Sequence, residues 1–199
     1  MTKYLAIDTS SRYLTVLARN GDKQSLRHLP ECAMRHSVIL MDEIDKALKE
    51  AALTPADCDF FAAVTGPGSF TGIRIGVATA KGFALAADKP LKAITAFDLI
   101  AYNVNSKNFI VAIDAAHAHY YVCGYKDGKV SLNPSYLSEA EVAALNLPVY
   151  GFEDLPFENY TRLDVKNCLK TAAEGCPLSE DMHALYVRKS QAEEALNGN

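Results

Sequence analysis

The same order of predicted elements, a strand, a hairpin and then a helix, occurs twice along the chain. This repeat constrains the fold more than any other feature. The first half opens with an apolar strand ending in Ile-Asp, YLAIDTSS, and the second half opens with another, FIVAIDAAH. A predicted hairpin and then a helix follow each strand, and Asn-Gly-Asp at residues 20–22 is a strong turn signal. The repeat favours two related α/β domains, residues 1–104 and a smaller domain at 105–199, with the last segment able to pack back on the first.

Two long helices are predicted in the first half. Apolar residues recur at helical spacing over residues 36–53, and a second helix follows a glycine-rich turn and extends to about residue 87. In the second half, Ser138 and Glu141 are spaced as a capping box for a short helix, and another helix is expected near residues 162–174. The chain is therefore expected to be mixed α/β throughout.

Composition narrows the classes of partner. The 199 residues carry a net charge of −4 without a basic stripe, so an autonomous nucleic-acid binder is disfavoured, and any RNA would be reached only through another chain. The sequence has no signal-peptide pattern and no apolar run near the roughly 18 residues of a membrane span, so we expect a cytoplasmic protein without membrane contact. Five cysteines without a Cys-x-x-Cys pair are typical of reduced thiols.

Five of the eleven glycines lie within residues 64–87, in VTGPGSFTGIRIGVATAKGFALAA. The spacing matches none of the usual phosphate or nucleophile loops. A P-loop needs a lysine after its last glycine, a dinucleotide loop needs a third glycine where the chain has Thr71, and a nucleophile elbow needs glycines where Pro67 and Thr71 flank Ser69. The glycines are therefore expected to serve packing and turn formation.

Four small residues in this segment, Gly72, Gly76, Ala80 and Ala84, lie four apart and form one stripe of a helix that Ser69 or Thr71 can cap. A glycine inside a helix costs roughly 1 kcal/mol relative to alanine, so the stripe indicates that another element approaches closely. Two explanations remain open: the helix packs on the protein's own sheet, or it packs on a helix of a partner chain.

The turn after the first strand contains Asp8, Thr9 and Ser10, and Asp114 is its counterpart in the second half. In sugar-kinase, Hsp70 and actin-like proteins such a turn binds nucleotide phosphate and metal, whereas elsewhere it is an ordinary turn with Asx and Ser/Thr hydrogen bonds. The adenosine site of that architecture usually has a Gly-Gly turn, and this chain has no Gly-Gly. An ATPase or phosphotransferase using Asp8 and Asp114 is kept as the alternative function.

Histidine spacing gives no metal site. His117 and His119 are predicted to share one face of a strand, but no His-x-x-x-His or His-Glu-x-x-His occurs, and a metallopeptidase is disfavoured. No Ser/His/Asp or Cys/His arrangement can be identified either. We therefore expect no catalytic residue and no metal ligand.

Several segments together resemble the TsaB (YeaZ) family of tRNA threonylcarbamoyladenosine biosynthesis proteins. They are LAIDTSS near the N-terminus, His36-Ser37 at the first helix, TGPGSFTGIRIGVATAKGFA at 65–84, ITAFDLIA at 94–101 and Tyr-Val-Arg at 186–188. The resemblance is strong over residues 1–113 and weak beyond them. Its most specific motif is GPGSFTG followed by Arg74 and Gly76.

The resemblance implies an actin/Hsp70/sugar-kinase-like (ASKHA) fold of two domains with the second domain reduced. It also implies a non-catalytic partner that activates the TsaD transferase in threonylcarbamoylation of the adenosine beside the anticodon of ANN-decoding tRNAs. By the same resemblance, a TsaE-like ATPase would join the pair, and the protein would pair with itself when TsaD is absent. ATP and metal belong to the partners, so the chain is expected to need no cofactor of its own.

The resemblance also assigns site residues. The family's pairing surface comes from its first two helices, which match residues 37–52 and 70–87, and Asp8, Thr9, Ser10 and Asp114 would form a vestigial nucleotide site. Where the family commonly has a basic turn after the second Asp, this chain has Ala-Ala-His at 115–117. The expected partner-binding residues are Ser37, Leu40, Met41, Ile44, Phe70, Thr71, Gly72, Ile73, Gly76, Ala80, Phe83 and Ala84.

Overall fold

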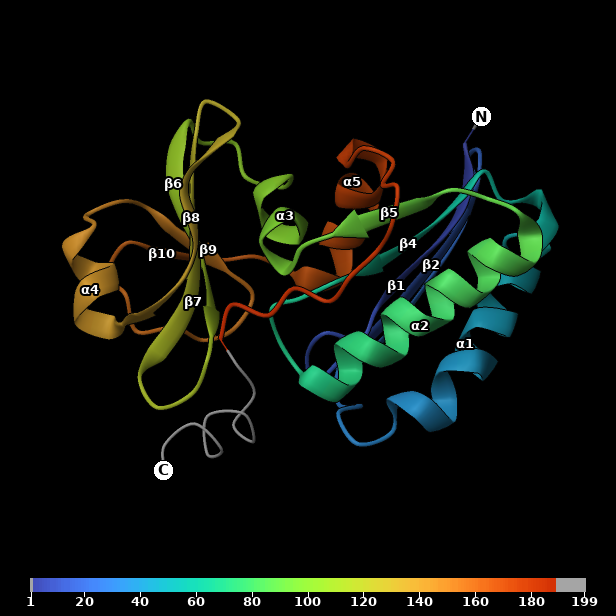
Figure 1. Ribbon diagram of the computed structural model, residues 1–199, viewed down its shortest axis with the longest axis horizontal. Coiled ribbons are helices and arrows are strands. Elements are labelled where there is room, and N and C mark those ends of the chain that lie inside the picture. The colour runs from blue at the N-terminus through green and yellow to red at the C-terminus, as the bar shows by residue number, and fades with distance from the viewer. Residues whose placement is uncertain (1, 189–199) are drawn as a thin grey trace.

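The computed structural model describes residues 2–188. Its first sheet has the strand order β3-β2-β1-β4-β5, in which β1, β2 and β3 pair antiparallel and β4 and β5 run parallel to β1 (Figure 1). The Asn-Gly turn joins β2 to β3 as predicted. The elements are β1 (Lys3–Asp8), β2 (Leu14–Asn20), β3 (Lys23–Leu29), α1 (His36–Glu50), a 3-10 turn (Pro55–Asp57), β4 (Phe60–Val64), α2 (Phe70–Ala87) and β5 (Leu91–Ile94).

The second sheet repeats this connectivity. Its order is β10-β9-β6-β7-β8, with β6, β7 and β8 antiparallel and β9 and β10 parallel to β6. The repeat read from the sequence is therefore present as two sheets of the same topology. The elements are β6 (Asn108–Asp114), β7 (His119–Lys126), β8 (Lys129–Ser138), α4 (Glu139–Ala144), β9 (Val149–Gly151) and β10 (Tyr160–Arg162).

The second domain is reduced in its helices and not in its sheet. The only helix between β8 and β9 is α4, of six residues, which begins at the predicted Ser138–Glu141 capping box. Residues 152–159, which join β9 to β10, contain no helix, whereas α2 joins the corresponding strands of the first domain. The helix expected at 162–174 is instead the end of β10, a 3-10 turn (Val165–Asn167) and α5 (Cys168–Gly175).

Alternation along β1 builds two cores. Leu5 and Ile7 face α1 and α2, while Tyr4 and Ala6 face the layer between the two sheets. That middle layer contains α3 (Ala96–Ala101) and α5, and its hydrophobic cluster joins residues of both sheets (Figure 1). The two domains therefore share one core along their common boundary.

The C-terminal part returns to the first domain. Helix α5 packs against β1, β2 and β5, and Nζ of Lys92 on β5 donates to the carbonyl oxygen of Ala173 at 2.8 Å near the end of α5. Ser179 then forms a β-bridge with Leu91. Residues 168–182 thus pack on the first sheet, as the expectation that the last segment is able to pack back on the first domain allowed.

Candidate functional site

The turn after β1 is closed on itself. Oδ1 of Asp8 accepts hydrogen bonds from the backbone N–H of Ser10 at 2.9 Å and from its hydroxyl at 2.7 Å, and Oδ2 accepts from the hydroxyl of Tyr13 at 2.9 Å. Asp8 is 1% exposed, and burial raises the pKa of its carboxyl. The two bonds from Ser10 are those of an Asx-type turn, the ordinary explanation of the motif, and Tyr13 adds a third from its side chain.

Three glycines, Gly68 in the turn before α2 and Gly72 and Gly76 in α2, pack on this same turn. A Cβ at Gly68 would overlap the carbonyl oxygen of Ser10, a Cβ at Gly72 would overlap that of Thr9, and a Cβ at Gly76 would lie 2.5 Å from Oγ1 of Thr9. The hydroxyl of Thr9 donates to the carbonyl oxygen of Gly72 at 2.7 Å. These three glycines therefore pack against the protein's own chain, and the space that they clear is not available to a partner helix.

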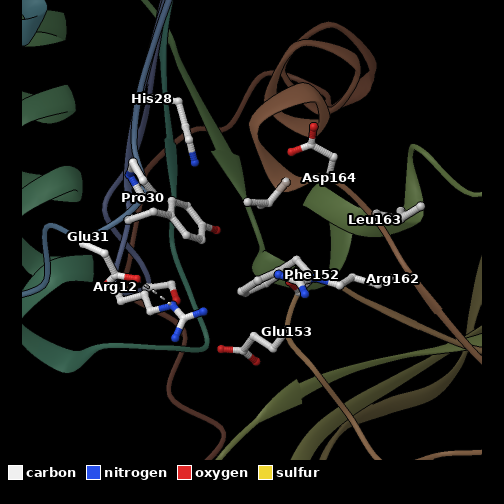
Figure 2. A pocket seen from close by; sticks show the side chains of 12 residues that line it. Arg12, His28, Pro30, Glu31, Phe152, Glu153, Arg162, Leu163 and Asp164 are labelled. Carbon is white, nitrogen blue, oxygen red and sulfur yellow. Dashed lines mark hydrogen bonds and ion pairs between the residues drawn. The ribbon is translucent and has the colours of Figure 1, made fainter.

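A cavity of about 420 Å³ lies between the two domains beside this turn (Figure 2). Its wall in the first domain has Arg12, in an ion pair with Glu31 at 3.8 Å, and Tyr13, whose ring meets that of Phe152 edge-on at 5.7 Å. Charges of both signs face the cavity, so its chemistry is mixed. The lining residues are Ser11, Arg12, Tyr13, His28, Pro30, Glu31, Phe152, Glu153, Arg162, Leu163, Asp164 and Val165.

Asp114 lies at the rim of the same cleft. Its backbone N–H donates to Oε2 of Glu153 at 2.7 Å, its Oδ1 accepts from the N–H of Ala116 at 2.8 Å, and burial raises the pKa of Glu153. A smaller cavity of about 200 Å³ is lined by both Ser10 and Asp114. The structure thus brings the two predicted turns together across the domains, but the Asp8 carboxyl lines neither cavity.

The histidine pair lies differently from the prediction. His117 is in a turn with positive φ, and β7 begins only at His119, so the two side chains do not share a strand face. The His119 ring stacks on Tyr136 with 4.7 Å between the ring centres. In the described part of the chain, no three His, Cys, Asp or Glu side chains gather in a way that could hold a metal ion.

Exposed apolar side chains gather on the outer faces of α1 and α2, which we call the α1–α2 surface. Met34, just before α1, is 94% exposed, and Leu85 near the end of α2 is 87% exposed. Val38, Met41 and Phe70 are exposed too. A cluster of large exposed apolar residues on neighbouring helices is typical of a protein-interaction surface.

Only part of the predicted partner-binding set lies on this surface. Ser37, Met41, Phe70 and Thr71 are exposed, and Phe83 is half-buried against Phe61. The other seven residues fill the core between the helices and the first sheet, because they occupy the apolar side of each amphipathic helix. These seven are Leu40, Ile44, Gly72, Ile73, Gly76, Ala80 and Ala84.

The sequence prediction missed the outward face of α2. Ala78, Gly82 and Ala86 are exposed at a spacing of four, and a Cβ at Gly82 would have no atom within 4 Å. The fold does not require glycine at that position. Gly82 itself was the sequence signal for this outward face. The helical period places this mid-helix glycine on the opposite side from Gly72 and Gly76.

No helix of residues 2–188 combines the length and the apolar character that a membrane crossing needs. The two sheets of one topology, the shared layer between them and the cleft beside the β1 turn define the two-domain ASKHA class of α/β protein. The family model of TsaD, the tRNA N6-adenosine threonylcarbamoyltransferase, matches residues 27–152. Within that relationship, the chain belongs to the TsaB (YeaZ) family.

Individual relatives support this placement. The TsaB protein of Bacillus subtilis is 30% identical over 62% of this chain and 56% of its own length, and that of Haemophilus influenzae is 37% identical over 56% and 48%. The chain thus spans about half the length of the curated relatives it matches. A Pseudomonas aeruginosa structure described as similar to peptidase YEAZ superposes with a TM-score of 0.75 at 22% identity, covering 94% of this chain and all of that one.

Proposed function

We propose that this chain is the non-catalytic partner of a TsaD-type transferase and activates it in threonylcarbamoylation of the adenosine beside the anticodon of ANN-decoding tRNAs. The observation that carries the proposal is the exposed apolar α1–α2 surface, with Met34, Val38, Met41, Phe70 and Leu85. Large apolar side chains held in water on two adjacent helices favour burial against another chain.

The nature of the partner follows from the family relationship. The TsaD model matches residues 27–152, a range that contains both α1 and α2. A TsaD-type chain would therefore carry two equivalent helices, and two such faces can pack against each other about a pseudo-twofold axis. Exposed small residues at Ala78, Gly82 and Ala86 would let the helices approach closely.

The family resemblance and the chemistry of this chain together suggest where tRNA, ATP and metal would bind in the complex. The net charge of −4 favours contact with tRNA through the partner, and the Asp8 carboxyl already accepts three hydrogen bonds within the protein. By the family resemblance, ATP and metal would be bound by other subunits, namely the transferase and a TsaE-like ATPase. The proposal includes no cofactor for this chain and a cytoplasmic location.

Co-purification with the TsaD-type transferase of the same organism tests the proposal. Val38→Asp places a charge on the α1–α2 surface and should abolish binding, because an unpaired carboxylate would be desolvated in the interface. Val130→Asp is the matched control, since Val130 is also exposed but lies on β8 of the second domain. Binding by both variants as strong as that of the wild type would refute the proposed surface.

The second candidate is an ATPase or phosphotransferase using Asp8 and Asp114. The cavity of about 420 Å³ between the domains favours it, and the burial of Asp8 argues against it. Purified protein with Mg²⁺ and ATP decides between the two functions. Turnover that Asp8→Asn abolishes would support this candidate, and we expect no turnover.

A further inference from the structure

The last described segment forms a strap across the first domain, which we define as residues 179–188. Ser179 bridges to Leu91 of β5, and Lys81 of α2 pairs with Asp181 at 2.7 Å. The backbone N–H of Leu185 then donates to the carbonyl oxygen of Thr65 at 2.7 Å, next to the glycine-rich turn. The strap is thereby fixed at several points before it reaches the start of α2.

Gly66 accommodates the strap at this crossing. It has a φ of +104°, and a Cβ there would lie 2.8 Å from the carbonyl oxygen of Leu185. A side chain at Gly66 would therefore both strain the turn and displace the strap. The glycine-rich turn and the C-terminal segment are built to fit each other.

The strap brings Tyr186 onto the amino-terminal end of α2. Its ring lies 5.0 Å from that of Phe70 between centres, and its hydroxyl accepts a hydrogen bond from Nε of Arg74 at 2.9 Å. The guanidinium carbon of Arg74 lies 3.7 Å from the centre of the Phe70 ring. Two aromatic residues from distant parts of the chain therefore hold one guanidinium on the α1–α2 surface.

This guanidinium is held in place but not neutralised. Arg74 is exposed, and in the range 2–188 no carboxylate forms an ion pair with it. Its Nε is engaged by Tyr186, which leaves the planar Nη groups for an external acceptor. A stacked, preorganised arginine binds a carboxylate or phosphate with less loss of side-chain entropy than a free one.

We propose that Arg74, held by Tyr186 of the strap and by Phe70, binds a carboxylate side chain of the TsaD-type partner. The inference rests on the proposed function and extends its interface to the C-terminal segment. Arginine and tyrosine are the residue types that most often dominate binding energy at protein interfaces. The adjoining apolar residues provide the surface that excludes water around such a pair.

A protein carboxylate fits this site better than an RNA phosphate. The exposed face of α1 carries Asp42 and Asp45, and the apolar ring of Phe70 lies against Arg74 on α2. Phosphate-binding surfaces gather several cations, because their affinity comes from releasing counterions. The other basic residue of α2 is Lys81, and it is already paired with Asp181.

The test measures the dissociation constant for the TsaD-type transferase by calorimetry with three variants. Arg74→Lys keeps the charge but loses the planar fork, and should weaken binding about tenfold. Tyr186→Phe keeps the ring and loses only the hydrogen bond to Arg74, and should weaken binding by a smaller factor. Arg12→Lys, in the cleft, is the matched control and should bind as the wild type does.

The outcomes separate the two proposals. If Val38→Asp abolishes binding while Arg74→Lys and Tyr186→Phe bind as tightly as the wild type, this inference is wrong and the proposed function stands. If the Arg74 variant keeps its affinity for the transferase but weakens tRNA binding by the complex, the guanidinium serves a phosphate and the inference is again overturned. Absence of binding by the wild type overturns both.

Discussion

Gly72 and Gly82 lie on the same helix, yet the fold requires only one of them. Gly72 packs on the carbonyl oxygen of Thr9, whereas a Cβ at Gly82 would point into open space. We therefore expect Gly72→Ala to destabilise the protein by about 1–3 kcal/mol, as overpacked sites do. Gly82→Ala should stabilise the isolated chain by up to about 1 kcal/mol through helix propensity.

Urea unfolding of the two variants and the wild type measures both effects. Equal loss of stability in the two would mean that the helix is rotated from the orientation described above. For the same reason Gly76→Leu is unsuitable for testing partner binding, because a side chain there would collide with Thr9 inside the protein.

Asp8 should make stability depend on pH. Burial raises the pKa of its carboxyl in the folded protein. A raised pKa contributes stability that is complete below the usual value for aspartate and is lost as pH rises through the raised value. We expect Asp8→Asn, which cannot ionise, to gain stability relative to the wild type between about pH 4 and pH 7.

The difference in unfolding free energy between these two proteins, measured at several pH values, isolates Asp8. Glu153 has a raised pKa as well, but it is present in both proteins and cancels from the difference. The difference should amount to about 1.4 kcal/mol for each unit by which the folded pKa is raised. A difference that is flat from pH 4 to pH 7 would contradict the burial of an ionisable carboxyl at this turn.

At the scale of elements, the sequence predicted the local structures well and the long-range ones poorly. Helical periodicity and the Ser69 cap located α1 and α2 closely, because both signals are local. The sequence allowed the last segment to pack back on the first domain, but it did not reveal that Tyr186 meets Phe70 or which strands α5 contacts. Such contacts join distant segments, and no periodicity within either segment encodes them.

The same reasoning explains why seven members of the predicted partner-binding set lie in the core. Periodicity identified which residues of α2 share a face, but it did not identify which face meets the sheet. Gly76 and Ala80 were assigned to a partner, although the protein's own β1 turn and sheet occupy that side. In the sequence, only the position of Gly82 indicated which side of α2 faces outward.

The strap, residues 179–188, should contribute to the stability of the first domain. Met182 is 1% exposed and lies in the cluster beneath α1 and α2. We expect Met182→Ala to cost about 2–5 kcal/mol, the range for truncating a buried methionine. Met34→Ala is the matched control, because Met34 is 94% exposed, and it should change stability by no more than about 0.5 kcal/mol.

Thermal and urea unfolding measure this pair of variants. A Met182→Ala protein as stable as the wild type would show that packing of the strap does not stabilise the core beneath α1 and α2. Met34→Ala has a second use, since it should weaken binding of the TsaD-type transferase while leaving the fold intact. Stability would then be assigned to Met182 of the strap and partner binding to Met34 of the α1–α2 surface.

At the scale of the whole molecule, the two cores on either side of the first sheet determine which surfaces of the first domain are free. The shared core between the sheets fixes the domains to each other and leaves a mixed-charge cleft, while the core beneath α1 and α2 leaves its helices facing solvent. The outer helices of the first domain therefore present large apolar side chains that residues 2–188 do not cover. That layer is the part of the molecule that association would cover.

Without its partner, the chain should pair with itself through the α1–α2 surface, because a twofold axis would bury the same apolar patch on both copies. We expect the wild type to sediment as a concentration-dependent dimer at micromolar concentrations and Met41→Asp to sediment as a monomer. Added TsaD-type transferase should convert the dimer into a heterodimer, since both associations use one surface. A homodimer that persists beside bound transferase would require a second interface, and dimerisation of Met41→Asp as strong as that of the wild type would place the self-pairing elsewhere.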